Sequence, residues 1–74
     1  MSRLIRMDQT GHATVAEWRF DDPQTIEAAV AAFRSELEQG FYAIAAHANG
    51  RAEHVRELPV DASLVILRRP IAGG

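Results

Sequence analysis

The 74-residue chain contains no cysteine. It can therefore form no disulfide bond, and it has no thiolate for nucleophilic catalysis. A zinc site would have to rely on the three histidines and on carboxylates. His12, His47 and His54 each lie in or beside an expected turn or polar strand, without the close spacing of a ligand set. We therefore expect exposed, solvated histidines, no metal site and no cofactor.

Lysine is also absent, and all eight basic residues are arginines. Two explanations remain open. One is codon bias in a GC-rich genome, which would also account for the many alanines. The other is that a protein handled by lysine-modifying machinery avoids becoming its own target. In either case, no isopeptide chain can be built through a lysine side chain of these residues.

Long hydrophobic runs are missing as well. The apolar stretches are far shorter than the roughly 20 residues that cross a bilayer, and Arg3 and Arg6 interrupt any signal-peptide core. Acidic and basic residues are interspersed and sum to a net charge of -2, so the chain lacks the basic footprint of nucleic-acid binding. We expect a cytoplasmic monomer with no membrane or nucleic-acid partner.

Paired catalytic carboxylates are not evident either. Asp8, Asp21 and Asp22 are explained better as a turn residue and helix caps than as an acid/base pair. The sequence therefore predicts no enzyme active site in this chain.

The first twenty residues have the pattern of a β-hairpin. Two short segments, 3–7 and 13–20, combine apolar, threonine and aromatic residues suited to a pleated sheet. Asp8 and Gly11 bound the segment between them, as in a type I turn followed by a glycine bulge. We predict one antiparallel hairpin over residues 3–20.

A helix is expected next. Asp22 can act as its N-cap, Pro23 suits its first position, and Gly40 stands where a helix commonly ends. The helical period predicts an apolar face directed at the sheet, formed by Ile26, Val30, Phe33 and Leu37. The charged residues Glu27, Arg34, Glu36 and Glu38 are expected to lie largely away from it.

Three further strands are expected, over 41–46, 52–58 and 63–68. The last is apolar on both faces at its centre, as in a strand flanked by partners on both sides. A ββαβββ order, with one long helix across a mixed sheet and the last strand beside the first, is α+β and describes the β-grasp arrangement. The main rival, a ferredoxin-like fold, needs a second helix that the pattern lacks. Core or core-rim positions are predicted for the aromatic residues Trp18, Phe20, Phe41 and Tyr42.

Three blocks carry a resemblance to a known family. They are the hairpin Gln9-Thr10-Gly11-His12-Ala13-Thr14-Val15, the helix start Thr25-Ile26-Glu27, and the end Ser63-Leu64-Val65-Ile66-Leu67-Arg68-Arg69 with Gly73-Gly74. In order and spacing they resemble ubiquitin. The tail Pro70-Ile71-Ala72-Gly73-Gly74 is closer still to the sulfur carriers of that superfamily, the small subunit of molybdopterin synthase and the thiamine sulfur carrier. The blocks cover about half the chain. Segment 41–61 departs from ubiquitin because it lacks that protein's second small helical region.

The resemblance implies a β-grasp domain over residues 1–69 and a flexible tail over 70–74. It further implies a carrier whose Gly74 carboxylate is adenylated by an E1-like enzyme, for sulfur transfer to an acceptor or conjugation to lysines of target proteins. Gly73 and Gly74 would be the reacting end. The arm would be formed by Pro70, Ile71 and Ala72, and it would be docked by Arg68 and Arg69.

Ubiquitin-like proteins usually contact partners through the open face of the sheet. The resemblance therefore implies an apolar partner surface, for which Leu4, Ile44 and Val65 are the candidates. A second hypothesis remains open beside the carrier: a small non-catalytic β-grasp interaction module whose Gly-Gly pair is incidental.

Overall fold

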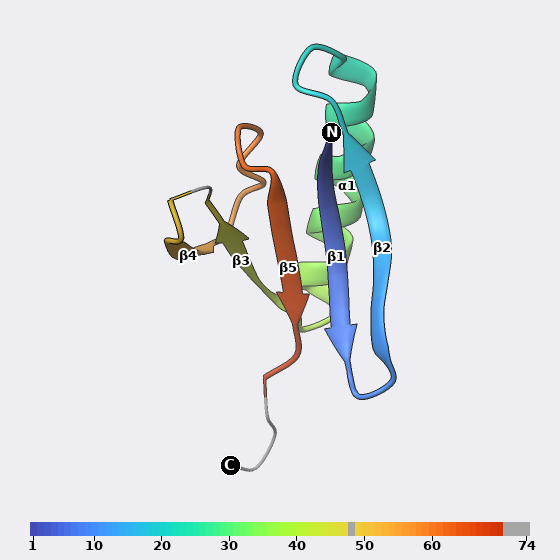
Figure 1. Cartoon of the computed structure of the whole chain (residues 1–74). Helices are drawn as coiled ribbons and strands as arrows, with labels where there is room; N and C mark the ends of the chain where they lie inside the picture. The colour runs from blue at the N-terminus through green and yellow to red at the C-terminus, as the bar shows by residue number, and fades with distance from the viewer. Residues whose placement is uncertain (48, 71–74) are drawn as a thin grey trace.

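The fold is α+β: one helix and a five-stranded mixed sheet, in a computed structural model that describes residues 1–47 and 49–70 (Figure 1). The chain order is β1, β2, α1, β3, β4 and β5. Their bounds are β1 Ser2–Asp8, β2 Gly11–Trp18, α1 Pro23–Glu38, β3 Tyr42–Ala46, β4 Ala52–Val55 and β5 Leu64–Arg68. The order of two strands, one helix and three strands is the one predicted from the sequence.

The sheet has the strand order β2-β1-β5-β3-β4. Its central strand β5 runs parallel to β1, with Leu4 opposite Val65, and antiparallel to β3, with Ile44 opposite Ile66. The prediction that the last strand lies inside the sheet and beside the first is therefore confirmed. Because parallel neighbours end at the same edge, the last residues of β1 and β5 lie close together.

The hairpin turn agrees with the sequence pattern. Asp8 pairs with Gly11, and Gly11 has a φ of +120°, a region that side-chain-bearing residues rarely adopt. Midway along the hairpin, a register shift between Leu4 and Ile5 introduces a bulge. The bulge leaves Thr14 opposite Ile5 and Ala16 opposite Leu4.

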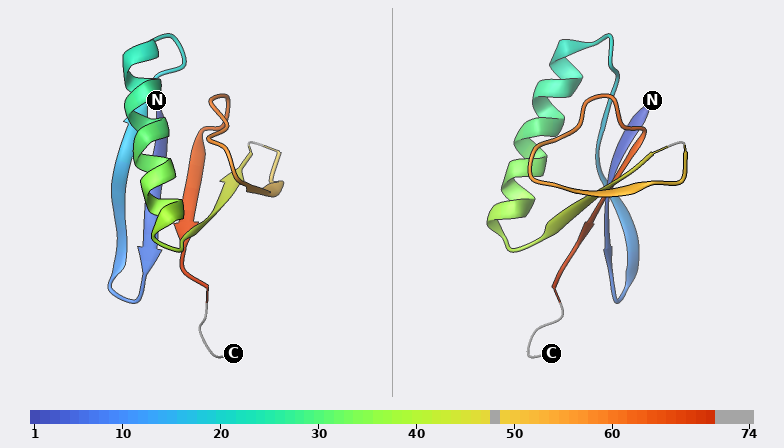
Figure 2. Two further views of the ribbon diagram at one scale, coloured as in Figure 1. Left: turned by 180° about the vertical axis from the view of Figure 1, so that it is seen from behind. Right: turned by 90° about the vertical axis from the view of Figure 1, so that its left-hand side faces the viewer.

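Helix α1 begins and ends where its capping residues predict. The Asp22 carboxylate accepts a hydrogen bond from the Gln24 N–H, and Pro23 is the first helical residue. Gly40, with a φ of +101°, follows the C-cap and turns the chain into β3. The helix lies across one face of the sheet and leaves the other uncovered (Figure 2).

The core lies between α1 and the covered face of the sheet. Leu4, Val65 and Leu67 reach it from the central strands, and Phe33 reaches it from the helix. Trp18 closes one end, fully buried, and its indole N–H donates to the Val60 carbonyl at 3.0 Å. The remaining predicted helix-face residues, Ile26, Val30 and Leu37, are half-buried and pack against this core.

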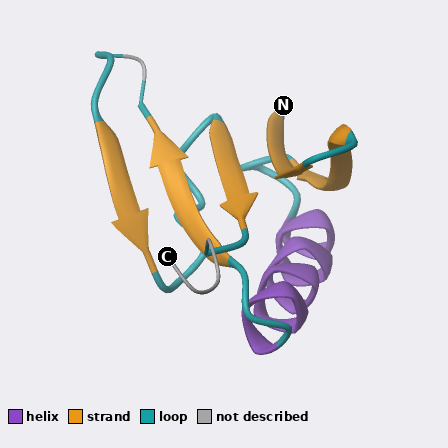
Figure 3. Ribbon diagram, turned by 90° about the horizontal axis from the view of Figure 1, so that it is seen from below, coloured by secondary structure: helices purple, strands orange, loops and turns teal. Residues whose placement is uncertain are grey.

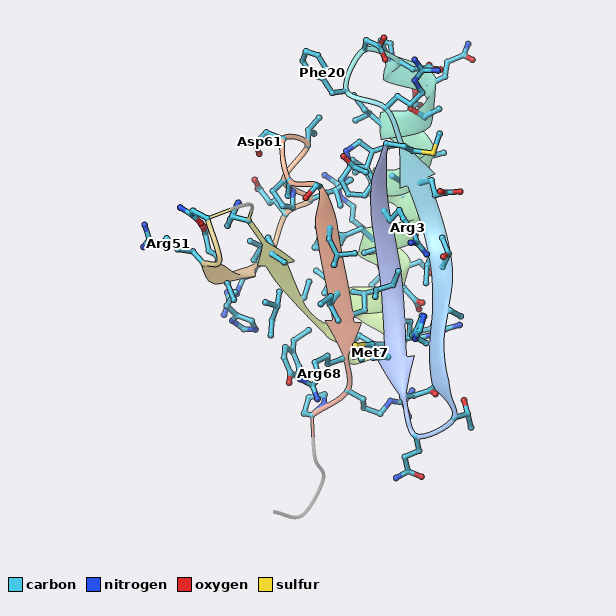
Figure 4. All side chains as sticks on the ribbon, viewed as in Figure 1. Arg3, Met7, Phe20, Arg51, Asp61 and Arg68 are labelled. Carbon is cyan, nitrogen blue, oxygen red and sulfur yellow. The ribbon has the colours of Figure 1, made fainter. Side chains whose placement is uncertain are left out.

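Three expectations need correction. Glu36 is buried rather than solvated, because it lies one helical turn from Phe33 on the covered face. Phe20 is 80% exposed, because it follows β2 in the loop before α1 and extends away from the core (Figure 4). Strand β4 ends at Val55 rather than Leu58, because Leu58 turns inward and is buried in the core.

The only helix in the described part of the chain, α1, is too short and too polar to cross a membrane.

Candidate functional site

The β1–β2 turn, the segment from α1 to β3 and the end of β5 line an open groove at one edge of the sheet. We call it the tail groove, and its principal residues are Arg6, Phe41, Arg68, Arg69 and Pro70. The chain leaves the sheet here, at the end of β5 (Figure 1). The sequence-predicted residues Arg68, Arg69 and Pro70 all line this groove. The predicted Ile71, Ala72, Gly73 and Gly74 lie outside the described residues.

A partly buried ion pair lies beside the tail groove, and its arginine, Arg6, lines the groove. The Arg6 Nη1 donates to Glu36 Oε1 at 2.8 Å, joining the centre of β1 to the last turn of α1. The Glu36 side chain is 6% exposed and that of Arg6 is 36% exposed. A buried carboxylate near a helix C-terminus faces both desolvation and the negative end of the helix dipole. Arg6 offsets both costs.

The ring of Phe41 contacts two guanidinium groups in the groove. Arg6 Cζ lies 5.7 Å from the ring centroid, and Arg69 Cζ lies 4.9 Å from it. Both distances are within the range of cation–π attraction. Phe41 is only 8% exposed, so core packing fixes the ring on which these cations lie. Glu36 neutralises Arg6, which lowers the repulsion between the two arginines.

Arg68 takes the opposite direction from Arg69. Along β5, Val65 and Leu67 are buried against the helix, so the alternation of a strand directs Ile66 and Arg68 to the uncovered face. Arg68 is exposed, and its cross-strand neighbours are Met7 and Tyr42 (Figure 4). Among the described residues, no carboxylate lies within ion-pair distance of Arg68.

The pKa of the Asp8 carboxyl, at the rim of the groove, is lowered by the turn in which it lies. The Thr10 hydroxyl donates to Asp8 Oδ1 at 2.6 Å, and the Thr10 N–H donates to the same oxygen at 2.8 Å. These bonds, in that order, hold the pKa of the Asp8 carboxyl below its ordinary value of 3.8, with smaller contributions from the charges of Arg6 and Arg69. The turn therefore holds a carboxylate beside the groove.

A lowered pKa gives the Asp8 contribution a definite pH dependence. Since the folded-state pKa lies below the unfolded one, ionised Asp8 stabilises the fold above pH 3.8, and this stabilisation is lost as the pH falls through the folded-state pKa. We expect carbon NMR of the Asp8 carboxyl to give a midpoint below 3.8, and Thr10→Ala to raise it. An unchanged midpoint in Thr10→Ala would contradict the assigned cause.

Breaking the Arg6–Glu36 pair should cost measurable stability. Arg6→Ala leaves the Glu36 carboxylate buried without its partner. We expect a loss of about 2 kcal/mol in the free energy of unfolding, below the 3–5 kcal/mol of fully buried pairs because Arg6 is partly exposed. Urea denaturation followed by Trp18 fluorescence measures it. The matched control is Arg3→Ala, whose exposed arginine lies on the same strand and donates to Thr14 Oγ1.

For Arg3→Ala we expect a change within about 0.5 kcal/mol. The double variant Arg6→Ala/Glu36→Leu should recover part of the loss, because it removes the unpaired carboxylate. Equal stabilities of the Arg6→Ala and Arg3→Ala variants would show that the pair does not stabilise the fold.

The uncovered face of the sheet is the second candidate surface (Figure 3). Ile5, Ile66 and Ile44 stand opposite one another on β1, β5 and β3. Ile66 and Ile44 are half-buried and Met7 is 40% exposed, whereas Ile5 is only 9% exposed and adds little accessible area. Ile44 was predicted for a partner surface and lies on this face, half-buried. Leu4 and Val65 were predicted with it. Both are fully buried against α1, so they are not available to a partner.

The histidines do not form a site in the described part of the chain. His12 and His54 are exposed, as expected, whereas His47 is half-buried with Nε2 3.6 Å from Glu53 Oε2. His54 packs edge-on against Tyr42, with ring centroids 5.4 Å apart. Within residues 1–47 and 49–70, no cluster of three or more histidine or acidic side chains could hold a metal ion.

No protein-family model, curated protein or solved structure matches this chain.

Sequence reasoning missed three components of these surfaces. Glu36 follows the buried Phe33 at helical spacing, a signal that its face is covered despite its charge. Ile5 and Ile66 alternate with the buried Leu4 and Val65, so each apolar strand has two candidate faces. The contact of Phe41 with Arg69 had no local signal, because the two residues meet only once β3 and β5 pair.

Proposed function

We propose that this protein is a ubiquitin-like carrier of β-grasp fold, activated at the Gly74 carboxylate by an E1-like adenylating enzyme. The observation that carries the proposal is the position of the Gly73-Gly74 pair in the chain. It follows the central strand β5 after Arg69, Pro70 and two further residues, and β5 ends at an arginine-bearing groove. This is the arrangement that the resemblance to the sulfur carriers implies.

The fold supports the proposal in two respects. The sheet order β2-β1-β5-β3-β4, with β1 and β5 parallel and one helix on one face, is compatible with the β-grasp arrangement expected from the sequence. Arg69 precedes Pro70, and a residue before proline is biased toward an extended conformation. An extended conformation at Arg69 suits the proposal, because the partner enzyme must be able to reach the Gly74 carboxylate.

The chemistry needs no catalytic group in this chain. One oxygen of the Gly74 carboxylate attacks the α-phosphorus of ATP on the partner enzyme. The bond between the α-phosphorus and its bridging oxygen breaks, and pyrophosphate leaves with the electron pair. The product is an acyl-adenylate, whose carbonyl is a far better electrophile than a free carboxylate. Hydrosulfide then displaces AMP to give a thiocarboxylate, or a cysteine thiol of the partner enzyme displaces AMP to give a thioester, from which a target lysine amine displaces the thiol.

Glycine suits the reacting positions for a steric reason. Without a Cβ, Gly73 and Gly74 have the width of the backbone alone and can follow a narrow channel to the bound ATP. Pro70 fixes one backbone angle of the arm.

Mass spectrometry on protein recovered from its native host tests the proposal. A sulfur-for-oxygen exchange at Gly74 would identify a sulfur carrier. Lysines on other proteins bearing Arg69-Pro70-Ile71-Ala72-Gly73-Gly74 would identify a modifier, because trypsin cuts after Arg68 and not at Arg69-Pro70. An unmodified Gly74 carboxylate under every growth condition, or a mature chain that continues past Gly74, would contradict the proposal.

The uncovered sheet face favours a second candidate function, a non-catalytic interaction module. Ile44, Ile66 and Met7 give this face apolar area that the helix does not cover. In such a module the Gly-Gly pair would be incidental, and partner binding would survive its removal.

A further inference from the structure

Two consecutive arginines at the end of β5 have different surroundings. Arg69 lies with its guanidinium 4.9 Å from the centroid of the Phe41 ring, on the side of the sheet that α1 covers. Arg68 lies on the uncovered face, beside Met7 and Tyr42. The alternation of a strand separates the two side chains, so one partner surface cannot contact both in the same way.

Core packing and a backbone hydrogen bond hold Phe41, on whose ring the Arg69 guanidinium lies. Phe41 is held by the core, and its backbone N–H donates to the Glu36 carbonyl at 3.2 Å. Arg6, on the same ring, is paired with the Glu36 carboxylate. The Phe41 ring therefore contacts two guanidinium groups. That of Arg6 is paired with a carboxylate, whereas that of Arg69 forms no ion pair with another described residue. Asp8, whose pKa is lowered in part by Arg69, adds a negative charge at the rim of the same groove.

We infer that Phe41 is a positioning residue for Arg69, the second of the two arginines at the end of β5. It holds the Arg69 guanidinium on the helix side of the sheet, while Arg68 remains on the open face to bind a carboxylate of the partner. The docking role of Arg68 rests on the proposed function, whereas the stack itself does not. The partner surface that fits this edge carries an acidic side chain facing the uncovered sheet, next to the channel for the tail.

Arginine is suited to both positions for separate reasons. A guanidinium is planar and weakly hydrated, so it stacks on an aromatic face while its N–H groups remain in contact with water. The same planar fork binds a carboxylate through two parallel hydrogen bonds. Lysine would satisfy neither geometry as well. An Arg→Lys substitution at either position therefore tests whether that position needs a guanidinium.

Proton NMR on the full chain tests the stack directly. The aromatic ring current should move the side-chain δ and ε protons of Arg69 upfield of those of Arg68. Phe41→Leu should abolish this difference, and Phe41→Tyr should retain it because the aromatic face remains. Arg69→Lys provides a second variant at an exposed site, should Phe41→Leu fail to fold. Equal shifts for Arg68 and Arg69 in the wild-type chain would overturn the inference.

A double-mutant cycle tests the division of roles. The readout is the rate at which host extract and ATP convert the Gly74 carboxylate, followed by intact mass. We expect Phe41→Leu and Arg69→Ala each to slow conversion about 2- to 5-fold, in line with one cation–π contact, and the pair to be no slower than either alone. Arg68→Ala combined with Phe41→Leu should instead show the product of the two single effects.

Multiplicative effects for Phe41→Leu with Arg69→Ala would overturn the positioning role. If the wild-type chain is never converted, the proposed function fails and the docking role of Arg68 fails with it. The NMR result would still decide whether Phe41 holds Arg69.

Discussion

Removal of Gly73 and Gly74 is expected to abolish adenylation and every later step while leaving the fold intact. In the described part of the chain the core is formed by residues between Leu4 and Leu67, and the two glycines have no side chain to add to it. Under the proposed function, the deletion removes the carboxylate that would react and the two residues narrow enough to reach the bound ATP. The measurement compares wild-type and truncated chains for ATP-dependent conversion in host extract, and for urea midpoint by Trp18 fluorescence.

A variant of equal length controls for the loss of chain. Gly73→Ala keeps the terminal carboxylate and adds one Cβ to the arm, so we expect reduced but detectable conversion and an unchanged urea midpoint. The interaction-module hypothesis predicts a different result. It holds if a partner captured by the wild-type chain is captured equally by the truncated chain, and if function in the host survives the deletion.

Phe33→Ala is expected to remove a large part of the domain's stability. Phe33 is 1% exposed at the centre of the helix face, and truncating a buried phenylalanine costs about 3–5 kcal/mol. A chain of this length has a total stability of about 4–11 kcal/mol. The expected loss is comparable to the whole free energy of unfolding at the lower end of that range. Circular dichroism and urea denaturation measure it, with Trp18 retained as the fluorescent probe of the core.

Arg34→Ala is the matched control for Phe33→Ala. Arg34 is the next helical residue and is exposed, so we expect a change within about 0.5 kcal/mol. Phe33→Leu keeps most of the buried volume and should fall between the two. A cost below about 1 kcal/mol for Phe33→Ala would show that the helix does not depend on this contact, against the principle that buried aromatic truncation is costly.

Much of the fold follows from local chemistry. Asp22, Pro23 and Gly40 mark the ends of α1 because their backbone and side-chain preferences act within a few residues. The central place of β5 was also predictable, since its apolar centre on both faces requires partners on both sides. These features need no knowledge of the tertiary structure.

The choice of covered face could not be predicted in the same way. In β5 the pair Val65 and Leu67 and the pair Leu64 and Ile66 are equally apolar, so the sequence does not tell which pair faces α1. The three-dimensional packing decides it, and this is why Leu4 and Val65 were assigned to a partner surface although both are buried. The same limit applies to Glu36. Its charge predicts an exposed side chain, and only the three-dimensional structure shows that Arg6 of β1 pairs with it.

Of the candidate site, the sequence predicts the two arginines and the Gly-Gly pair but not the groove that Arg68 and Arg69 line. Arg68 and Arg69 are adjacent and chemically identical, and only the pairing of β5 with β1 and β3 separates their environments. Phe41 was predicted as a core residue, which is confirmed. Its contact with Arg69 depends on strand pairing between distant segments and so has no signature in the local sequence.

The most direct test of the central claim is chemical trapping of the activated Gly74 carbonyl. The full chain is incubated with host extract, ATP and hydroxylamine, and its mass is read. Hydroxylamine nitrogen attacks the acyl-adenylate carbonyl, AMP or a downstream thiol leaves, and a hydroxamate remains at Gly74. We predict a hydroxamate that forms only with ATP and only on chains retaining Gly73-Gly74. A Gly74 carboxylate that stays unchanged in extract with ATP, while the chain remains folded, would contradict the account.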